Sequence, residues 1–392
     1  MNFFVILLAC VSCVYGSSKL LSVVVVYRHG FRTPTEFAST DKYKDKETYW
    51  SDEPGELINR GKQEHYALGQ WLRSRYQDFL PAKYNKNDIY VRSSQTDRCL
   101  MSAAANLAGL YPPKGDQIWN ADLHWMPIPI HTVPTKEDNL LKMGKVCPNF
   151  QPKFEELLNS DNFTAIDKAN TELYEYLSES LGEKIKRFSD IEPFYDTMTI
   201  EDEYEMKRPN WTNKILKDGT RVYPDAMKKW ADLAFAIPTY TPELARLGTG
   251  RFFDTLASHF EAVVKNDTKN KLADKMVMFS AHKSTVCDLT HTLGVFRVTP
   301  YAGALIFELR RNPDTQKNYV NTIFKSSDIE RLEICGSDFD CDFNKFLEIL
   351  KPYRLNEKQW KAECLSGAAS AAVVSIKTFS SLTVFLVLYV LS

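Results

Sequence analysis

Hydrophobic residues form short runs near both ends of the central chain. Residues 20–27 read Leu-Leu-Ser-Val-Val-Val-Val-Tyr, a β-branched run typical of a strand buried on both faces of a sheet. Similar runs predict strands at 88–91, 275–280, 304–310 and 319–325, and amphipathic patterns predict helices at 57–76, 96–110 and 284–294. Strands therefore alternate with helices, which indicates an α/β fold.

The middle of the chain has a different pattern. Between about residues 134 and 241, helical periods rich in Glu, Lys and Tyr are interrupted by Pro and Trp, and no convincing strand is found. We expect a helical domain at 134–241, inserted between a first α/β part at 17–133 and a second at 242–365. The two sheet parts must meet in space, so that His29 and His282 can lie together.

The first residues predict a leader. Residues 1–16 carry no charged side chain and contain an apolar run before small residues, which is typical of a signal peptide cleaved near Gly16. The alternative is a buried first strand. Cleavage removes two of the eight cysteines and leaves six, and three Asn-x-Ser/Thr sequons stand at Asn162, Asn210 and Asn266. These features predict a secreted, glycosylated chain with disulfide bonds.

The last residues predict a processed or anchored tail. Within 366–392, small residues precede an apolar stretch that ends the chain, as in a lipid-anchor signal of the glycosylphosphatidylinositol type. The stretch is short for a spanning helix, so a weak transmembrane segment is the alternative. We therefore expect an extracellular or lumenal protein that can be attached to a membrane.

Charge and short motifs exclude several functions. Lys plus Arg number 49 and Asp plus Glu number 50, so no excess charge indicates a nucleic-acid partner. A Cys-x5-Arg motif and a nucleotide P-loop are both absent from the sequence. The other histidines lack metal-ligand spacing, and we expect no metal and no cofactor; they are His65, His124, His131, His259 and His291. The sequence leaves open whether the chain is a monomer or a homodimer.

One short segment carries candidate chemistry. Arg28-His29-Gly30-Phe31-Arg32-Thr33-Pro34 directly follows the first strand. Arginine presents a rigid fork that matches phosphate oxygens, and glycine allows a turn that brings neighbouring side chains to one point. The pattern predicts a phosphate site beside a nitrogen nucleophile, at the strand end where α/β sheets place ligands. The alternative is a basic surface turn.

This segment resembles the Arg-His-Gly-x-Arg-x-Pro signature of the histidine acid phosphatase family. The resemblance extends to Gly55-Glu56-Leu57 with Gly61, to 94–103, to 119–134 and to Phe279-Ser280-Ala281-His282. It implies a mixed sheet flanked by helices, with a smaller helical insertion. It also implies that His29 is the nucleophile that forms a phosphohistidine, that Arg28, Arg32 and Arg98 hold the phosphate, and that His282 is a further phosphate ligand.

The sequence departs from this family at two positions. The family usually has His-Asp, where the acid protonates the leaving alcohol, but this chain has His282-Lys283. An ammonium with an ordinary pKa of about 10.4 is a poor acid for this step, although nearby arginines should depress its pKa. The alternatives are that Lys283 points away or that Asp288 substitutes for the missing acid. Phe31 stands where Asp is common, and it either lines the pocket or packs beneath the loop.

Two functions remain after these departures. The first is a secreted, phosphatase-like protein with little or no phosphomonoesterase activity, which binds small ligands. Damaged relatives in insect saliva suggest biogenic amines or leukotrienes, and the cationic site favours the leukotriene. The alternative is an active acid phosphatase that hydrolyses phosphate monoesters through His29. A carboxylate facing the arginines, with the Lys283 nitrogen outside the cavity, would favour the enzyme.

The cysteines predict three disulfides. The family resemblance implies the pairs Cys147–Cys364 and Cys335–Cys341. Parity and position then suggest Cys99–Cys287, because each of these cysteines stands close to a pocket residue in the sequence. Two free buried thiols are the alternative.

Overall fold

The structure is a computed structural model that describes residues 18–365. The predicted signal peptide at 1–16 and the predicted tail at 366–392 lie outside these residues. Within the described range, none of the helices is both long and apolar enough to cross a membrane.

The centre of the fold is a mixed sheet with the strand order β2-β3-β1-β4-β5-β6, and β7 pairs with β5. Strands β2, β3 and β1 run parallel, whereas β4 and β5 are antiparallel to their neighbours. Parallel β1 and β3 end at the same edge, where Arg28 is in register with Ala281. This edge carries the candidate site. The strands are β1 (Lys19–Arg28), β2 (Ile89–Ser93), β3 (Met276–Ala281), β4 (Ala304–Arg311), β5 (Asn318–Lys325), β6 (Ile329–Leu332) and β7 (Cys341–Asp342).

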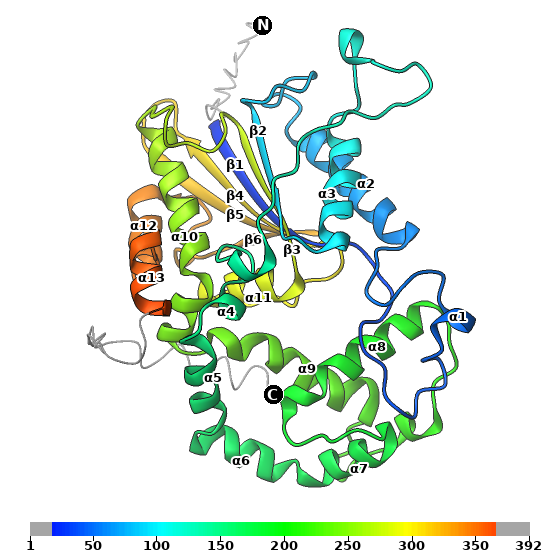
Figure 1. Cartoon of the computed structure of the whole chain (residues 1–392). Coiled ribbons are helices and arrows are strands. Elements are labelled where there is room, and N and C mark those ends of the chain that lie inside the picture. The colour runs from blue at the N-terminus through cyan, green and yellow to red at the C-terminus, as the bar shows by residue number, and fades with distance from the viewer. Residues whose placement is uncertain (1–17, 366–392) are drawn as a thin grey trace, which may run out of the picture.

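Helices cover both faces of the sheet and continue beyond one edge of it (Figure 1). In the α/β part they are α1 (Lys46–Tyr49), α2 (Asn59–Arg75), α3 (Asp97–Leu110), α10 (Pro242–Val264), α11 (Lys283–Thr292), α12 (Phe343–Leu350) and α13 (Glu357–Leu365). In the helical segment they are α4 (Met143–Val146), α5 (Phe150–Leu158), α6 (Asp161–Ala169), α7 (Thr171–Leu181), α8 (Glu192–Glu203) and α9 (Met227–Ala236).

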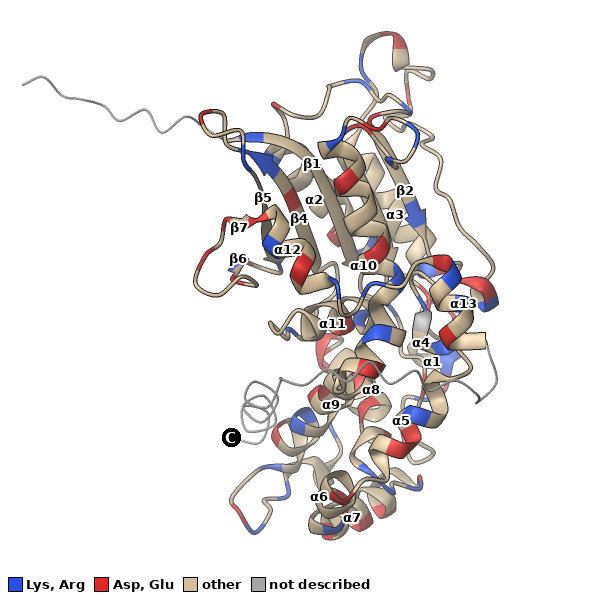
Figure 2. Cartoon of the chain, turned by 90° about the vertical axis from the view of Figure 1, so that its left-hand side faces the viewer, with Lys and Arg blue, Asp and Glu red and all other residues tan. Residues whose placement is uncertain are grey.

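The alternation of β1 explains why it is buried on both faces. Val23 and Val25 pack with residues of α2 and α3, whereas Val24 and Val26 pack with residues of α10 and α11. Charged residues of both signs are interspersed along the helices that cover this core (Figure 2). The apolar run of β1 therefore reflects a central strand that touches helices on both sides.

The helical segment has its own hydrophobic core. Leu177, Phe188, Met227 and Trp230 belong to one buried cluster made largely of residues from α6 to α9. These helices lie together below the sheet in Figure 1. The predicted domain limits at 134 and 241 stay a prediction.

The expected α/β fold and the eight elements proposed from the sequence are confirmed, with ends that move by no more than two residues. The prediction did not include α10, α12 and α13, nor the short strands β6 and β7.

Candidate active site

Two histidines meet at the ends of adjacent strands. His29 follows β1 and His282 follows β3, and their ring centroids lie 5.8 Å apart. The His29 amide donates to the Ala281 carbonyl at 3.0 Å, which ties the two strand ends together. Ser94, just after β2, pairs through Oγ with His282 Nε2 at 2.9 Å. Three neighbouring strands therefore contribute to one point.

The loop after β1 is held close to α2. A Cβ at Gly30 would collide with the backbone of Gly61, and a Cβ at Gly61 would collide with the backbone of Phe31. The Gly30 amide donates to Ser102 Oγ at 3.1 Å, and the Phe31 amide donates to Glu64 Oε2 at 2.8 Å. Gly30 is not among the glycines with positive φ. Its role is close packing against Gly61, rather than the turn that the sequence suggested.

The two nitrogens of the His29 ring have different roles in hydrogen bonding. Its Nδ1 lies 2.9 Å from the Gly30 carbonyl oxygen, so Nδ1 carries the proton and donates, and Nε2 keeps its lone pair. Burial, together with the charges of Arg28, Arg98 and Arg32, holds the His29 pKa well below its ordinary value. The ring is therefore neutral, as a nitrogen nucleophile requires.

Three guanidinium groups surround this nitrogen. Arg28 donates to the Thr299 carbonyl at 2.9 Å and lies over the Tyr301 ring at 3.6 Å. Arg32 donates to the Thr33 carbonyl at 2.9 Å, and Arg98 donates weakly to the Gly55 carbonyl at 3.3 Å.

In all three arginines the Nε–H is buried and has no protein acceptor. Buried donors of this kind need an acceptor, and a tetrahedral oxyanion supplies several.

Lys283 is partly buried, with 15% of its side chain exposed, and points toward the helical segment. Its Nζ lies 3.7 Å from Glu192 Oε1 in α8 and 4.0 Å from the centre of the Phe235 ring in α9. Burial lowers the Lys283 pKa, and Arg28 lowers it further, whereas Glu192 and Asp196 oppose the shift. Burial raises the Glu192 pKa against the opposing charge of Lys283. The lysine at the usual acid position therefore contacts a carboxyl group that the sequence did not single out.

A second carboxyl group of α8 faces the arginines directly. Asp196 accepts a hydrogen bond from Arg32 at 2.7 Å and lies 3.9 Å from Arg28. Burial alone would raise the Asp196 pKa, yet Arg32 and Arg28 hold it below its ordinary value. Glu192 and Asp196 are four residues apart, on one face of α8.

Two sequence alternatives are resolved by packing. Asp288 has no ion pair with the arginines among the described residues, and burial is the one cause that raises its pKa. Phe31 packs in a buried cluster with Trp50 and Ile200, and its ring meets Tyr301 at 5.0 Å. Asp288 therefore does not face the arginines, and Phe31 packs beneath the loop.

Two of the three expected disulfides are present, Cys147–Cys364 and Cys335–Cys341. The prediction of a Cys99–Cys287 bond is wrong, because both cysteines are free and buried. Cys99 Sγ contacts the Ala281 carbonyl from α3, and Cys287 Sγ contacts Thr299 from α11. Helices α3 and α11 cover opposite faces of the sheet, so the sheet separates the two sulfur atoms.

The remaining predictions concern the glycosylation sites and the other histidines. The three sequon asparagines are exposed, and their glycosylation stays a prediction. Among residues 18–365, no group of three or more His, Cys, Asp or Glu side chains is arranged to hold a metal ion. His65 supports the loop instead, because its Nε2 pairs with the Arg28 carbonyl at 3.0 Å.

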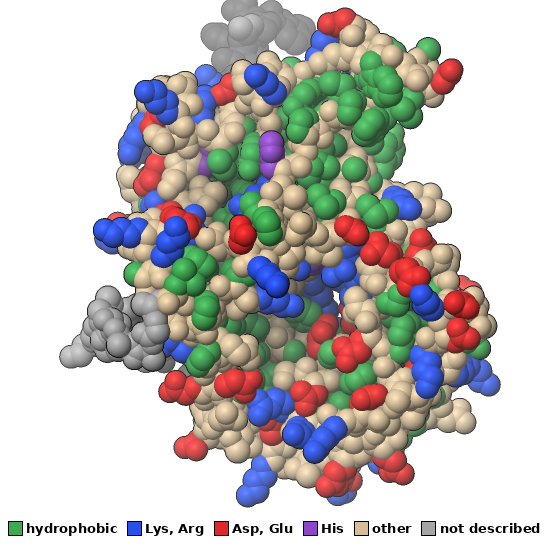
Figure 3. Space-filling view, in the orientation of Figure 1, with side chains coloured by type: hydrophobic (Ala, Val, Ile, Leu, Met, Phe, Trp, Pro, Cys, Tyr) green, Lys and Arg blue, Asp and Glu red, His purple; other side chains and the backbone are tan. Residues whose placement is uncertain are grey.

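Glu192 and Asp196 are the site residues that the sequence analysis missed. Neither belongs to a motif, and about 160 residues separate them from the Arg-His-Gly loop. The one signal is their i, i+4 spacing at the start of a helix, which is common on solvated faces. Figure 3 shows the molecule hollowed between the sheet part and the helical part, with side chains of both charge signs around the hollow.

Comparisons with known proteins agree with this geometry. The chain is 32% identical over 388 residues to the lysosomal acid phosphatase of Xenopus laevis, which covers 96% of this chain and 86% of the relative. It is 31% identical to the prostatic acid phosphatase of Bos taurus, with 89% and 88% covered.

Solved structures share the fold. The phytase of Citrobacter braakii aligns with a TM-score of 0.65 at 18% identity, covering 88% of this chain and 99% of that one. The phytase of Hafnia alvei in complex with myo-inositol hexakis sulphate aligns with a TM-score of 0.64 at 17% identity, covering 88% and 99%.

The family model "Histidine phosphatase superfamily (branch 2)" matches residues 19–325. Together with the two acid phosphatases, this match means that the chain belongs to branch 2 of the histidine phosphatase superfamily.

Proposed function

We propose that the chain hydrolyses phosphate monoesters through a phosphohistidine at His29, with the leaving-group proton supplied by Glu192 in contact with Lys283. The observation that carries the proposal is the contact of Lys283 Nζ with Glu192 Oε1 at 3.7 Å, because it puts a carboxyl group at the tip of the residue that replaces the usual acid.

The charges around His29 suit a phosphate. Arg28, Arg32, Arg98 and Lys283 are cationic, and Asp196 and Glu192 are acidic. When Glu192 carries the proton that it donates and Asp196 is ionised, three positive charges remain in excess, and a phosphate dianion offsets two of them. Phosphoryl transfer depends mainly on positioning and on neutralising the equatorial oxygens, so these side chains supply most of what the reaction needs.

The steps balance without any further reactant. His29 Nε2 forms a bond to phosphorus as the bond to the ester oxygen breaks, and the departing oxygen takes the Glu192 proton. Water then attacks the phosphohistidine and gives its proton to the Glu192 carboxylate, which releases His29 and inorganic phosphate. The raised Glu192 pKa keeps a larger fraction of this acid protonated as the pH rises than an ordinary glutamate would allow.

A second candidate is binding of a small amphiphilic anion, such as a leukotriene, without turnover. Two features favour it. The Lys283 ammonium lies over the Phe235 ring and Arg28 lies over Tyr301, so the site is both cationic and aromatic. Asp196 also occupies an Arg32 donor that a phosphate would otherwise use.

We also propose an oxidising location for the chain, either extracellular or lumenal. The two disulfides support it, since such bonds persist outside the cytosol. The membrane anchor and the homodimer stay predictions.

Hydrolysis of two esters at pH 5 tests the proposal. The aryl ester 4-nitrophenyl phosphate has a leaving group that needs no proton, whereas glycerol 2-phosphate has one that does. A working acid predicts kcat values on the two esters within about tenfold of each other, because a general acid contributes typically 10²- to 10⁴-fold. Slow aryl turnover with almost no alkyl turnover would contradict it. Binding of a leukotriene without hydrolysis of either ester would support the second candidate.

A further inference from the structure

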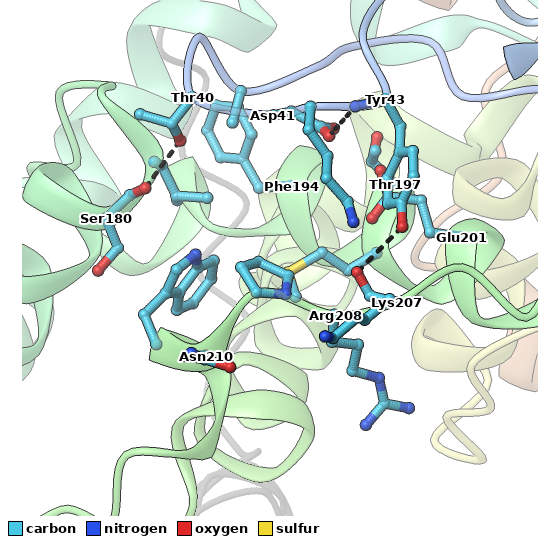
Figure 4. A pocket seen from close by; sticks show the side chains of 16 residues that line it. Thr40, Asp41, Tyr43, Ser180, Phe194, Thr197, Glu201, Lys207, Arg208 and Asn210 are labelled. Atoms are coloured by element: carbon cyan, nitrogen blue, oxygen red, sulfur yellow. Dashed lines mark hydrogen bonds between the residues drawn. The ribbon is translucent and has the colours of Figure 1, made fainter.

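A cavity of about 380 Å³ lies on a different side of α8 from the arginines. It is enclosed by the segment 38–43, the end of α7, α8 and the segment 207–211 (Figure 4). Its size is in the range of sites for small molecules, roughly 300 to 1,000 Å³. Its walls hold apolar and aromatic side chains together with two acids. These are Ala38, Tyr43, Leu181, Phe194, Met198 and Trp211 for the apolar wall, and Asp41 and Glu201 for the acids.

Glu201 is an unusual lining residue because it is 6% exposed and its Oε1 atom has no hydrogen-bond partner. The Asp41 side chain is its acidic neighbour and lines the same cavity. A buried carboxyl group beside another carboxyl group is harder to ionise. Burial and the Asp41 carboxyl raise the pKa of Glu201 to about 9. Glu201 therefore brings to the cavity a buried carboxyl oxygen that has no donor.

Asp41 is fixed in place by the backbone. The Tyr43 amide donates to Asp41 Oδ1 at 2.8 Å, and the Tyr43 hydroxyl donates to the Lys207 carbonyl at 3.1 Å. Both hydrogen bonds are drawn in Figure 4, where Phe194 and Glu201 extend from α8 toward them. The segment 38–43 and helix α8 therefore each bring an acid and an aromatic ring to the cavity, Asp41 with Tyr43 and Glu201 with Phe194.

The cavity is also lined by three cations. Lys42, Lys207 and Arg208 are all exposed. Arg208 pairs with Asp202, and the Lys42 ammonium lies over the Tyr43 ring, 4.3 Å from its centroid. The Lys42 contact demonstrates that the aromatic wall accepts an ammonium group.

We propose that this cavity binds a small organic cation, a primary ammonium group on an apolar or aromatic body, with the ammonium between Asp41 and Glu201. The body then packs against Phe194, Trp211 and Tyr43. The ammonium supplies the donor that Glu201 Oε1 lacks and favours the ionised Glu201 carboxylate, whose proton leaves for solvent. This site is separate from the arginine cluster and does not depend on the proposed hydrolysis.

Calorimetry with three matched probes tests the proposal at pH 7. They are 3-phenylpropylamine, its neutral analogue 3-phenyl-1-propanol and the anion 3-phenylpropanoate. We expect the amine to bind at least about tenfold more tightly than the alcohol, because one charge-assisted hydrogen bond in a buried site contributes roughly 1.5 to 3 kcal/mol. In buffers of different ionisation enthalpy, amine binding should release a fraction of a proton, up to one. Equal binding of amine and alcohol, no binding of the amine, or preference for the anion would each overturn it.

Three variants sharpen the test. Glu201→Gln should weaken the amine at least about tenfold, leave the alcohol unchanged and abolish proton release. Lys42→Gln should tighten the amine, because it removes a competing ammonium. Glu203→Gln is the control, since Glu203 is exposed on the same helix and pairs with Arg60. A melting curve for each variant separates loss of binding from loss of folding. An equal loss in Glu203→Gln and Glu201→Gln would overturn the proposal.

Discussion

The two walls of the active site differ in origin. One wall comes from strand ends and the helices that follow them, and it supplies His29, His282 and the three arginines. The other wall is α8 of the helical segment, and it supplies Glu192 and Asp196. The cationic wall is fixed by short, local connections, whereas the acidic wall depends on how the helical segment packs against the sheet. In the proposed function, α8 therefore supplies the missing acid without any change in the Arg-His-Gly loop.

The largest effect is expected on the sheet side. His29→Ala removes the nucleophile, and turnover of both 4-nitrophenyl phosphate and glycerol 2-phosphate should fall by more than about 10³-fold, since removing a catalytic nucleophile costs this much or more. Rapid-quench experiments with radiolabelled ester should trap a phosphoenzyme in the wild type and none in the variant. Turnover that survives in His29→Ala would place the nucleophile elsewhere.

The next largest effect is a gain in phosphate affinity, which we expect when the charge of Asp196 in α8 is removed. Asp196→Asn removes a negative charge that competes with phosphate for Arg32, so inhibition by inorganic phosphate should become about tenfold stronger. The melting temperature should fall, because Arg28 and Arg32 lose a buried counter-charge. Weaker phosphate inhibition would mean that Asp196 mainly orients Arg32.

A shift in the pH profile of kcat is expected when Lys283, which contacts Glu192 across the site, is replaced. The charge of Lys283 opposes the rise in the Glu192 pKa. Lys283→Met should therefore raise this pKa further, and the alkaline limb of the kcat profile on glycerol 2-phosphate should move to higher pH. The acid form is the active one, so activity is lost as pH rises through the pKa. An alkaline limb that does not move would mean that Glu192 does not supply the proton to the leaving group.

The smallest effect is expected on the pH dependence of the free energy of unfolding, through Glu201 in the cavity on the other side of α8. The Glu201 pKa of about 9 exceeds its ordinary value, so the folded state holds this proton more tightly than the unfolded state. The stability that this proton contributes is full below about pH 4.3 and declines as pH rises toward 9. Asp41, Asp202 and Lys42 face the same group. Melting curves of Glu201→Gln should vary less between pH 5 and 8 than those of the wild type, whereas an identical pH dependence would contradict this origin.

The two walls of the site also differ in how well the sequence could predict them. Strand β1 and the positions of Arg28, His29 and Arg32 could be predicted because they lie in one contiguous segment. A buried apolar run forms the strand, and the loop that carries these side chains begins where the run ends. His282 follows from a second such segment. Glu192 and Asp196 could not be recognised, since their function arises from the packing of α8 over the cleft. Cys99–Cys287 failed for a similar reason, because proximity in sequence to the pocket did not reveal that the sheet lies between the two sulfur atoms.

In the proposed function, a carboxyl group on α8 replaces the acid lost at Lys283. This replacement is tested most directly by the ratio of alkyl to aryl ester turnover at pH 5 in Glu192→Gln, with Glu175→Gln, an exposed position of α7, as the control. We predict that Glu192→Gln loses about 10²- to 10⁴-fold on glycerol 2-phosphate and less than about tenfold on 4-nitrophenyl phosphate, while the control keeps the wild-type ratio. Equal losses on the two esters, or no loss on either, would contradict the account.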